Sequence, residues 1–200
     1  MLNPSFQFSA LILGAGLSRR FGPTNKLLQD YDGKPVIRHV LDELKKLKLN
    51  QIIIVLGHQA DEVRQTLKGD PFTLIENQNY QDGMGTSIAA GAQALDQKSD
   101  GVFICPGDMP LIKAEQFTKL AEGFALDQIC VPIHEGQRGH PVLFANSYFQ
   151  ELELCQGDQG ARTVLQANKN NIHFIETPTP AIHYDIDEQK DIKRKGETSP

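Results

Sequence analysis

Short apolar runs alternate with amphipathic segments along most of this chain. The runs 8–13, 51–56 and 101–105 are rich in aliphatic residues, and each is followed by a glycine or a proline. Such runs are typical of strands that are buried on both faces. After Pro35, which suits the first turn of a helix, apolar residues recur at helical spacing over 36–47. The pattern predicts strands that alternate with helices.

The rest of the chain continues this alternation. It predicts further strands at 72–75, 128–133, 141–144, 172–175 and 182–186, and helices at 60–67, 86–95, 113–124, 160–166 and 187–193. We therefore expect an α/β fold of three layers (α/β/α) around a mostly parallel, Rossmann-like sheet. We expect residues 1–193 to form a single domain and the tail 194–200, which has little to bury, to be disordered.

The loops that follow the strands are where chemistry is expected. In open parallel sheets, ligands bind beyond the carboxyl ends of the strands. This rule places four loops on one edge of the sheet, at 14–26, 57–58, 77–85 and 106–110.

Composition narrows the function classes. The chain has 200 residues, of which 40% are hydrophobic, and its net charge of −5 argues against a nucleic-acid partner. No apolar run approaches the roughly 20 residues of a membrane span, and no signal peptide is visible. The three cysteines form no paired metal motif, and their odd number is not a disulfide framework. We expect a cytoplasmic protein with buried, reduced cysteines and no membrane contact.

The loop 14–26 combines glycines with a hydroxyl and several cations. Glycine allows the main chain to approach a ligand closely, and backbone N–H groups with nearby positive charge suit phosphate. Arg20 and Lys26 could neutralise phosphate oxygens. A Walker A loop is excluded because Pro23 follows Gly22, and the dinucleotide fingerprint is excluded because Arg19 stands where its third glycine belongs. The alternative is a solvated turn with incidental charges.

Carboxylates follow a buried strand and recur near the end of the chain. Asp108 lies just past the strand 101–105, between two prolines, where it could hold a divalent cation such as Mg²⁺. Asp185 and Asp187 are a second source of carboxylates. The alternatives are a turn aspartate or helix cap at Asp108, and a helix cap at Asp187.

Three further polar segments could complete a site. The segment 77–87 contains Gly83 and Gly85 and leads to Ser87 at a helix start. Arg138 and His140 stand at the foot of a predicted strand, and Arg162 stands at the start of a predicted helix. These residues could bind a phosphate of an acceptor, or they could cap a hairpin and a helix.

Taken in order, these segments resemble the nucleotidyltransferases of molybdenum-cofactor maturation, especially the molybdenum cofactor cytidylyltransferases. The family pattern Leu-Ala-Ala-Gly-x-Ser-x-Arg-Met-Gly-x-x-Lys is answered by residues 13–26, with Gly14 for alanine, Phe21 for methionine and one extra residue before Lys26. Further segments that resemble family motifs are 83–87, 106–110, 138–141, 157–162 and 185–187, although the run after Asp187 departs from the family's Thr-Pro-Glu. The wider group includes sugar-phosphate and methylerythritol-phosphate nucleotidyltransferases.

This resemblance implies a role for each candidate residue. Arg20, Lys26 and Asp108 are the expected catalytic residues. Asp108 and Asp187 are the expected ligands of Mg²⁺, with Asp185 as a substitute for the second. The expected nucleotide-binding residues are Leu13, Gly14, Ala15, Gly16, Ser18, Arg20, Lys26, Asp82, Gly83 and Ser87. The expected acceptor-binding residues are Arg138, His140 and Arg162.

The resemblance also implies a reaction and its partners. It implies a nucleotide-diphospho-sugar transferase type of fold and transfer of a nucleoside monophosphate, with CTP favoured by the loop around Ala15, Gly16 and Ser18. The expected acceptor is a phosphate monoester such as molybdopterin, and a molybdoenzyme or its chaperone could be a partner. The alternatives are a guanylyltransferase, a sugar- or polyol-phosphate nucleotidyltransferase, a non-catalytic module that binds nucleotide or molybdenum cofactor, and an inactive structural homologue.

Overall fold

A computed structural model of the chain describes residue 2 and residues 4–193. The strands are β1 (Phe8–Gly14), β2 (Asp30–Tyr31), β3 (Lys34–Pro35), β4 (Gln51–Leu56), β5 (Thr73–Glu76), β6 (Gly101–Pro106), β7 (Ile129–His134), β8 (Gln137–Arg138), β9 (Val142–Ala145) and β10 (Ile172–Glu176). The helices are α1 (Val36–Leu44), α2 (Ala60–Thr66), α3 (Met84–Ala92), α4 (Ala114–Glu122), α5 (Phe149–Glu153), α6 (Arg162–Ala167) and α7 (Gln189–Lys193). The predicted tail 194–200 lies outside the described residues.

The main sheet has the strand order β10-β7-β9-β6-β1-β4-β5, and β8 pairs with β7. The central strand β1 pairs in parallel with β4 on one side and with β6 on the other. The pairs β4–β5 and β10–β7 are also parallel, whereas β9 runs antiparallel to both β6 and β7. The prediction of a mostly parallel sheet is therefore confirmed.

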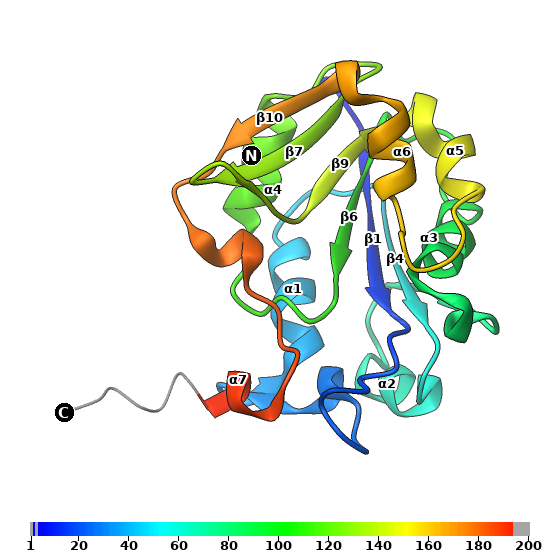
Figure 1. The fold of residues 1–200 in the computed structure, drawn as a ribbon, viewed down its shortest axis with the longest axis vertical. Coiled ribbons are helices and arrows are strands. Elements are labelled where there is room, and N and C mark those ends of the chain that lie inside the picture. The colour runs from blue at the N-terminus through cyan, green and yellow to red at the C-terminus, as the bar shows by residue number, and fades with distance from the viewer. Residues whose placement is uncertain (1, 3, 194–200) are drawn as a thin grey trace.

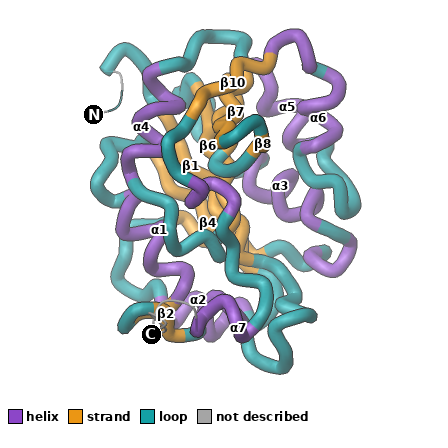
Figure 2. The backbone as a smooth tube through the Cα atoms, turned by 60° about the vertical axis from the view of Figure 1, so that its left-hand side comes forward, coloured by secondary structure: helices purple, strands orange, loops and turns teal. Residues whose placement is uncertain are grey.

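Helices cover both faces of this sheet, which confirms the predicted three layers. Helices α1 and α4 lie on one side, and α3, α5 and α6 lie on the other (Figures 1 and 2). In β1 only Leu13 keeps partial exposure, as expected for a strand with a helix layer on each face. Its one buried hydroxyl, that of Ser9, is hydrogen-bonded to Ser99 at 2.7 Å.

The predicted strand at 182–186 is wrong. Residues Pro180–His183 form a 3₁₀ turn, and the chain then runs on as an irregular segment to α7. The alternation of apolar and polar residues is real, because Ile182 and Ile186 are both fully buried. Ile186 packs with Phe21, Tyr31 and Val36, but within the described residues no strand pairing includes 182–186. The alternation of apolar and polar residues therefore indicates burial without a sheet ladder. Helix α7 accordingly begins at Gln189 rather than at residue 187.

A small second hydrophobic cluster lies apart from the main core. It contains Phe21 from the loop after β1, Tyr31 from β2, Val36 from α1 and Ile186 from the C-terminal segment. Partly buried Leu111, Tyr184 and Ile192 pack against it. The cluster joins the glycine-rich loop to the end of the described chain, two regions that are far apart in sequence.

Two expectations from composition can be compared with the structure. Cys105, Cys130 and Cys155 are all buried and form no disulfide. Within residues 2 and 4–193, no helix has both the length and the apolar character that crossing a membrane requires.

We expect Gly85→Ala to lower the free energy of unfolding by about 1–2 kcal/mol, because overpacking outweighs the gain in helix propensity. A Cβ at Gly85 would lie about 2.5 Å from backbone atoms of Gln156, and the Gly85 amide already donates to the Gly157 carbonyl at 2.7 Å. Urea denaturation measures the change. Gly16→Ala is the matched control, because nothing lies within 4 Å of its added Cβ. Equal urea midpoints for the two variants would contradict the expectation.

Candidate active site

The loops at the carboxyl ends of β1 and β6 enclose a cleft of about 830 Å³. Segments from the C-terminal third of the chain complete its walls. Of the residues predicted from sequence, those that line the cleft are Leu13, Ala15, Gly16, Ser18, Arg20, Lys26, Gly83, Ser87, Asp108, Arg138, His140, Arg162 and Asp187. The fold thus brings nearly all of the predicted site residues together.

Gly14 and Asp82 are predicted nucleotide-binding residues that the structure does not place on the cleft lining. Gly14 is the last residue of β1, and a Cβ there would lie 3.1 Å from the Val55 carbonyl oxygen. This close packing explains why the position is a glycine, whether or not a ligand binds there. Asp82 is exposed at the end of a 3₁₀ turn, immediately before Gly83, which does line the cleft.

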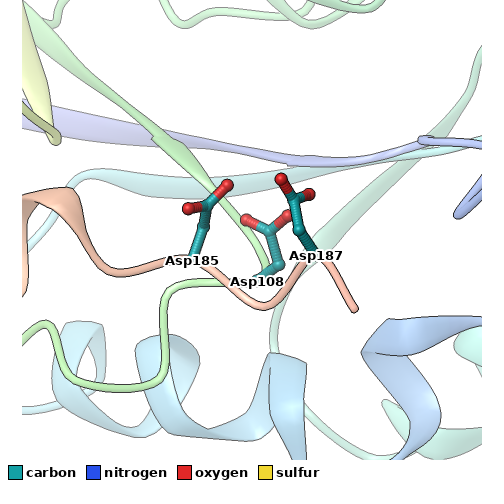
Figure 3. A group of neighbouring side chains, drawn as sticks. All are labelled: Asp108, Asp185 and Asp187. Carbon is teal, nitrogen blue, oxygen red and sulfur yellow. The ribbon is translucent and has the colours of Figure 1, made fainter. Parts of the chain in front are cut away.

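Three carboxylates that line the cleft, those of Asp108, Asp185 and Asp187, lie beside one another (Figure 3). Asp108 follows β6, and Asp185 and Asp187 come from the C-terminal segment. One ligand oxygen from each lies within 4.8 Å of the others. The backbone amide of Ile186, between the two C-terminal aspartates, donates to the Asp108 carbonyl at 2.9 Å. This hydrogen bond fixes the register of the C-terminal segment against the loop after β6.

Lys26 lies among these carboxylates. Its Nζ is 2.5 Å from Asp108 Oδ2 and 3.1 Å from Asp187 Oδ1, and only 14% of its side chain is exposed. Burial alone would lower the pKa of Lys26, but the contacts with Asp108 and then Asp187 outweigh burial and leave the pKa raised. The ammonium is therefore held charged at the centre of the site.

Arg20 is a second cation beside the carboxylates, and it approaches them from the solvent side. Its Nη2 lies 2.8 Å from Asp187 Oδ2, while 72% of its side chain remains exposed. Within the described residues, Asp185 forms no salt bridge of this kind. Burial raises its pKa, and the negative charges of Asp108 and Asp187 raise it further.

The carboxylates and the glycine-rich loop suit a divalent cation and a phosphate chain, respectively. Asp108 Oδ1 is buried and has no hydrogen-bond partner among residues 2 and 4–193, which is costly unless a ligand uses that oxygen. An all-oxygen set of this kind fits a hard cation such as Mg²⁺ or Mn²⁺. In the loop after β1, Ser18 has a φ of 52° and its carbonyl accepts from the amides of Phe21 and Gly22. The loop is thereby folded tightly and leaves Gly16 open to solvent.

The wall opposite the glycine-rich loop is made of two loops packed backbone to backbone. A Cβ at Gly83 would lie 2.3 Å from the carbonyl carbon of Gly157, and Gly83 has a φ of 107°. Only glycine satisfies both conditions. Ser87, which also lines the cleft, is held in place because its Oγ accepts a hydrogen bond of 3.0 Å from Asn77 Nδ2.

The predicted acceptor residues lie on the side of the cleft nearer β7. Arg138 is exposed, and its guanidinium stacks over the Phe174 ring at 4.8 Å. His140 donates its backbone N–H to the Ile182 carbonyl, and its Nδ1 is buried without a hydrogen-bond partner in the described part of the chain. Burial lowers the pKa of His140 against the opposing effect of Asp108, so the imidazole is neutral at pH 7. Arg162 is the first residue of α6.

Some lining residues escaped the sequence analysis. Tyr80, Met84, Asp158 and His183 line the cleft without having been assigned a role. Tyr80 packs over Gly57, where a Cβ would lie 2.7 Å from it. The glycine-rich segments that contain Tyr80 and Asp158 were visible in the sequence, but nothing in them indicated which side chains face inward.

Comparison with known proteins places this cleft in a wider context. The model of the MobA-like NTP transferase domain matches residues 10–172. The chain is 32% identical to the "Bifunctional protein GlmU" of Bordetella petrii over 175 residues, which cover 86% of this chain. Those residues cover 38% of the relative, so this chain spans well under half of that protein's length.

Solved structures show the same fold. A nucleotidyl transferase from Methanothermobacter superposes with a TM-score of 0.82 at 20% identity, covering 94% of this chain and 95% of that one. Rv0371c of Mycobacterium tuberculosis, solved in complex with manganese, has a TM-score of 0.77 at 22% identity and covers 96% of this chain and 100% of its own. At these identities the likeness concerns the fold.

We expect Lys26→Met to strengthen Mn²⁺ binding to the nucleotide-free protein by roughly tenfold or more, because the ammonium competes with a metal ion for the same oxygens. Electron paramagnetic resonance of free Mn²⁺ measures the affinity. Lys34→Met is the control, since Lys34 pairs with Asp42 rather than with the cleft carboxylates. An unchanged affinity in Lys26→Met would show that the ammonium does not block the cation site.

Proposed function

The chain belongs to the MobA-like NTP transferase family, and on that premise we propose that it transfers a nucleoside monophosphate to a phosphate monoester. The donor is a nucleoside triphosphate, and pyrophosphate is released. One observation carries the proposal: a cationic, glycine-rich loop and a cluster of three carboxylates face each other in one cleft. The first suits a triphosphate and the second suits the divalent cation that accompanies it.

The glycine-rich loop is the proposed nucleotide site. Four of the predicted nucleotide-binding residues, Leu13, Ala15, Gly16 and Ser18, line the cleft here. In our proposal, Gly16 and Ser18 contact the phosphates, and Leu13 and Ala15 contact the base. Gly83 and Ser87 on the opposite wall face the base and ribose. Asp82, outside the cleft lining, contributes at most through the turn that it ends.

Asp108, Asp185 and Asp187 are the proposed cation ligands, which adds Asp185 to the pair expected from sequence. The buried Asp108 oxygen without a partner and the all-oxygen donor set support a divalent cation, with Mg²⁺ favoured. A Mg²⁺ held by these carboxylates would supply charge that offsets the negative charge of the α-phosphate.

In the proposed reaction, the protein acts mainly by positioning charged groups around the reacting phosphates. An oxygen of the acceptor phosphate forms a bond to the α-phosphorus, and the bond from that phosphorus to the bridging oxygen of pyrophosphate breaks, the electron pair leaving with pyrophosphate. Arg20 and Lys26 neutralise the charge on the departing group. The acceptor phosphate is already ionised near pH 7, so no general base is required. Arg138, His140 and Arg162 orient the acceptor.

CTP and a molybdopterin-type phosphate are the substrates that we propose first, with a molybdoenzyme or its chaperone as a downstream partner. The support is the resemblance of the loop at Ala15, Gly16 and Ser18 to the cytidylyl branch. A guanylyltransferase or a sugar- or polyol-phosphate nucleotidyltransferase is the alternative, because the same cleft would serve any phosphate monoester. A non-catalytic nucleotide-binding module is a third possibility.

We expect Lys26→Ala and Asp108→Ala each to lower turnover by about two orders of magnitude or more, since each removes a charge that acts on the reacting phosphates. Pyrophosphate release measures turnover, and circular dichroism checks that both variants fold. Asp61→Ala is the control, because the Asp61 side chain is 91% exposed and pairs with Arg64. Normal turnover in either cleft variant would remove that residue from the proposed catalytic set.

We expect Mg²⁺-dependent pyrophosphate release when the protein is given CTP and molybdenum cofactor, and little release with GTP, ATP or UTP. The four nucleotides are tested separately with that acceptor and then with a panel of sugar phosphates. Release with GTP alone would keep the chemistry and overturn the choice of base. Release only with a sugar phosphate would select the alternative acceptor class, and silence with every pair would favour a binding module.

A further inference from the structure

The C-terminal segment 184–193 enters the cleft although it lies beyond residues 10–172, which the family model matches. It supplies Asp187, whose carboxylate meets both Arg20 and Lys26. It is anchored on one side by the hydrogen bond from Ile186 to Asp108 and by burial of the Ile186 side chain. These contacts locate the segment, but they do not by themselves fix the peptide groups that carry Asp187.

Asp191 makes the contacts that do so. Its Oδ2 accepts hydrogen bonds from the backbone N–H of Asp187 at 3.0 Å and of Glu188 at 2.8 Å. Its own carbonyl accepts from the Tyr184 hydroxyl at 2.8 Å, and its backbone N–H donates to the Glu188 carbonyl at 3.0 Å. Asp191 therefore holds the backbone at Asp187 and Glu188, and its carbonyl also holds the Tyr184 side chain, just before Asp185.

The hydrophobic cluster supports the same arrangement. Ile192, next to Asp191, packs with Tyr184 against Phe21, Tyr31 and Ile186. Phe21 lies in the glycine-rich loop, directly after Arg20. The turn that Asp191 closes therefore packs against the glycine-rich loop, which is proposed to bind the triphosphate. Asp187 lies between this turn and that loop.

We propose that Asp191 is a positioning residue that sets the Asp187 carboxylate in register with Asp108 for cation binding. The inference rests on the proposed function. Asp191 acts through the backbone of Asp187, as partners of metal ligands commonly do, and loss of such a partner typically costs about 10–100-fold in metal affinity. The requirement is for an acceptor oxygen at one place, because a single oxygen serves both amides.

The test separates that geometry from the negative charge. Asp191→Asn keeps an acceptor oxygen and removes the charge, whereas Asp191→Glu keeps the charge and moves the carboxylate off the two amides. Asp191→Ala removes both. Lys190→Ala, on the same short helix with a side chain 67% exposed, is the control. Mn²⁺ affinity of the full chain is measured by electron paramagnetic resonance, with thermal melting followed in parallel.

We expect Asp191→Ala and Asp191→Glu to bind Mn²⁺ about tenfold more weakly than the unmodified chain, and Asp191→Asn and Lys190→Ala to stay within about threefold of it. Unchanged affinity in Asp191→Glu would overturn the inference even if Asp191→Ala failed to fold. A loss in Asp191→Asn equal to that in Asp191→Glu would also overturn it, by assigning the effect to charge. If the unmodified chain bound no Mn²⁺, the proposed cation site would fall, and the inference with it.

Discussion

Repulsion among three carboxylates is the constraint around which this cleft is organised. One carboxylate oxygen from each of Asp108, Asp185 and Asp187 lies within 4.8 Å of the others, so their negative charges repel one another. Burial raises the pKa of Asp185, and the charges of Asp108 and Asp187 raise it further. Lys26 and Arg20 offset it, and both come from the glycine-rich loop. The charge balance therefore ties the proposed phosphate loop to the C-terminal segment.

The topology explains why these groups can meet at all. Strands β1 and β6 are parallel neighbours, and Leu13 is in register with Pro106, so the loop bearing Lys26 and the loop bearing Asp108 leave the sheet side by side. The C-terminal segment arrives by a different route, pinned to His140 through Ile182 and to Asp108 through Ile186. Substitutions far from the cleft can therefore alter it when they disturb this path.

The sequence predicted the layers and most of the cleft because those features are locally encoded. Aliphatic runs that end at glycine or proline identified β1, β4 and β6, and Asp108 follows β6 in sequence. The end of the chain was harder to predict, since Ile182 and Ile186 alternate with polar residues as they would in a strand. For the same reason, the sequence indicated Asp185 only as a substitute for Asp187 and not that both lie beside Asp108. The contact of Lys26 with the carboxylates was also not predictable, because it depends on three separate segments. The roles assigned to individual cleft residues remain predictions.

Lys26 is one cation that two kinds of anionic group share, the carboxylates of the cleft and the phosphates of the proposed substrate. In the structure it neutralises Asp108 and Asp187, and in the proposed reaction it neutralises phosphate oxygens. The ammonium has three N–H donors, and its contacts with Asp108 and Asp187 leave only one of them for a phosphate oxygen. A divalent cation bound to the carboxylates would replace the ammonium there and free it for the phosphates. On this argument, we expect nucleotide and metal ion to favour each other's binding, because both would be coupled through the Lys26 side chain.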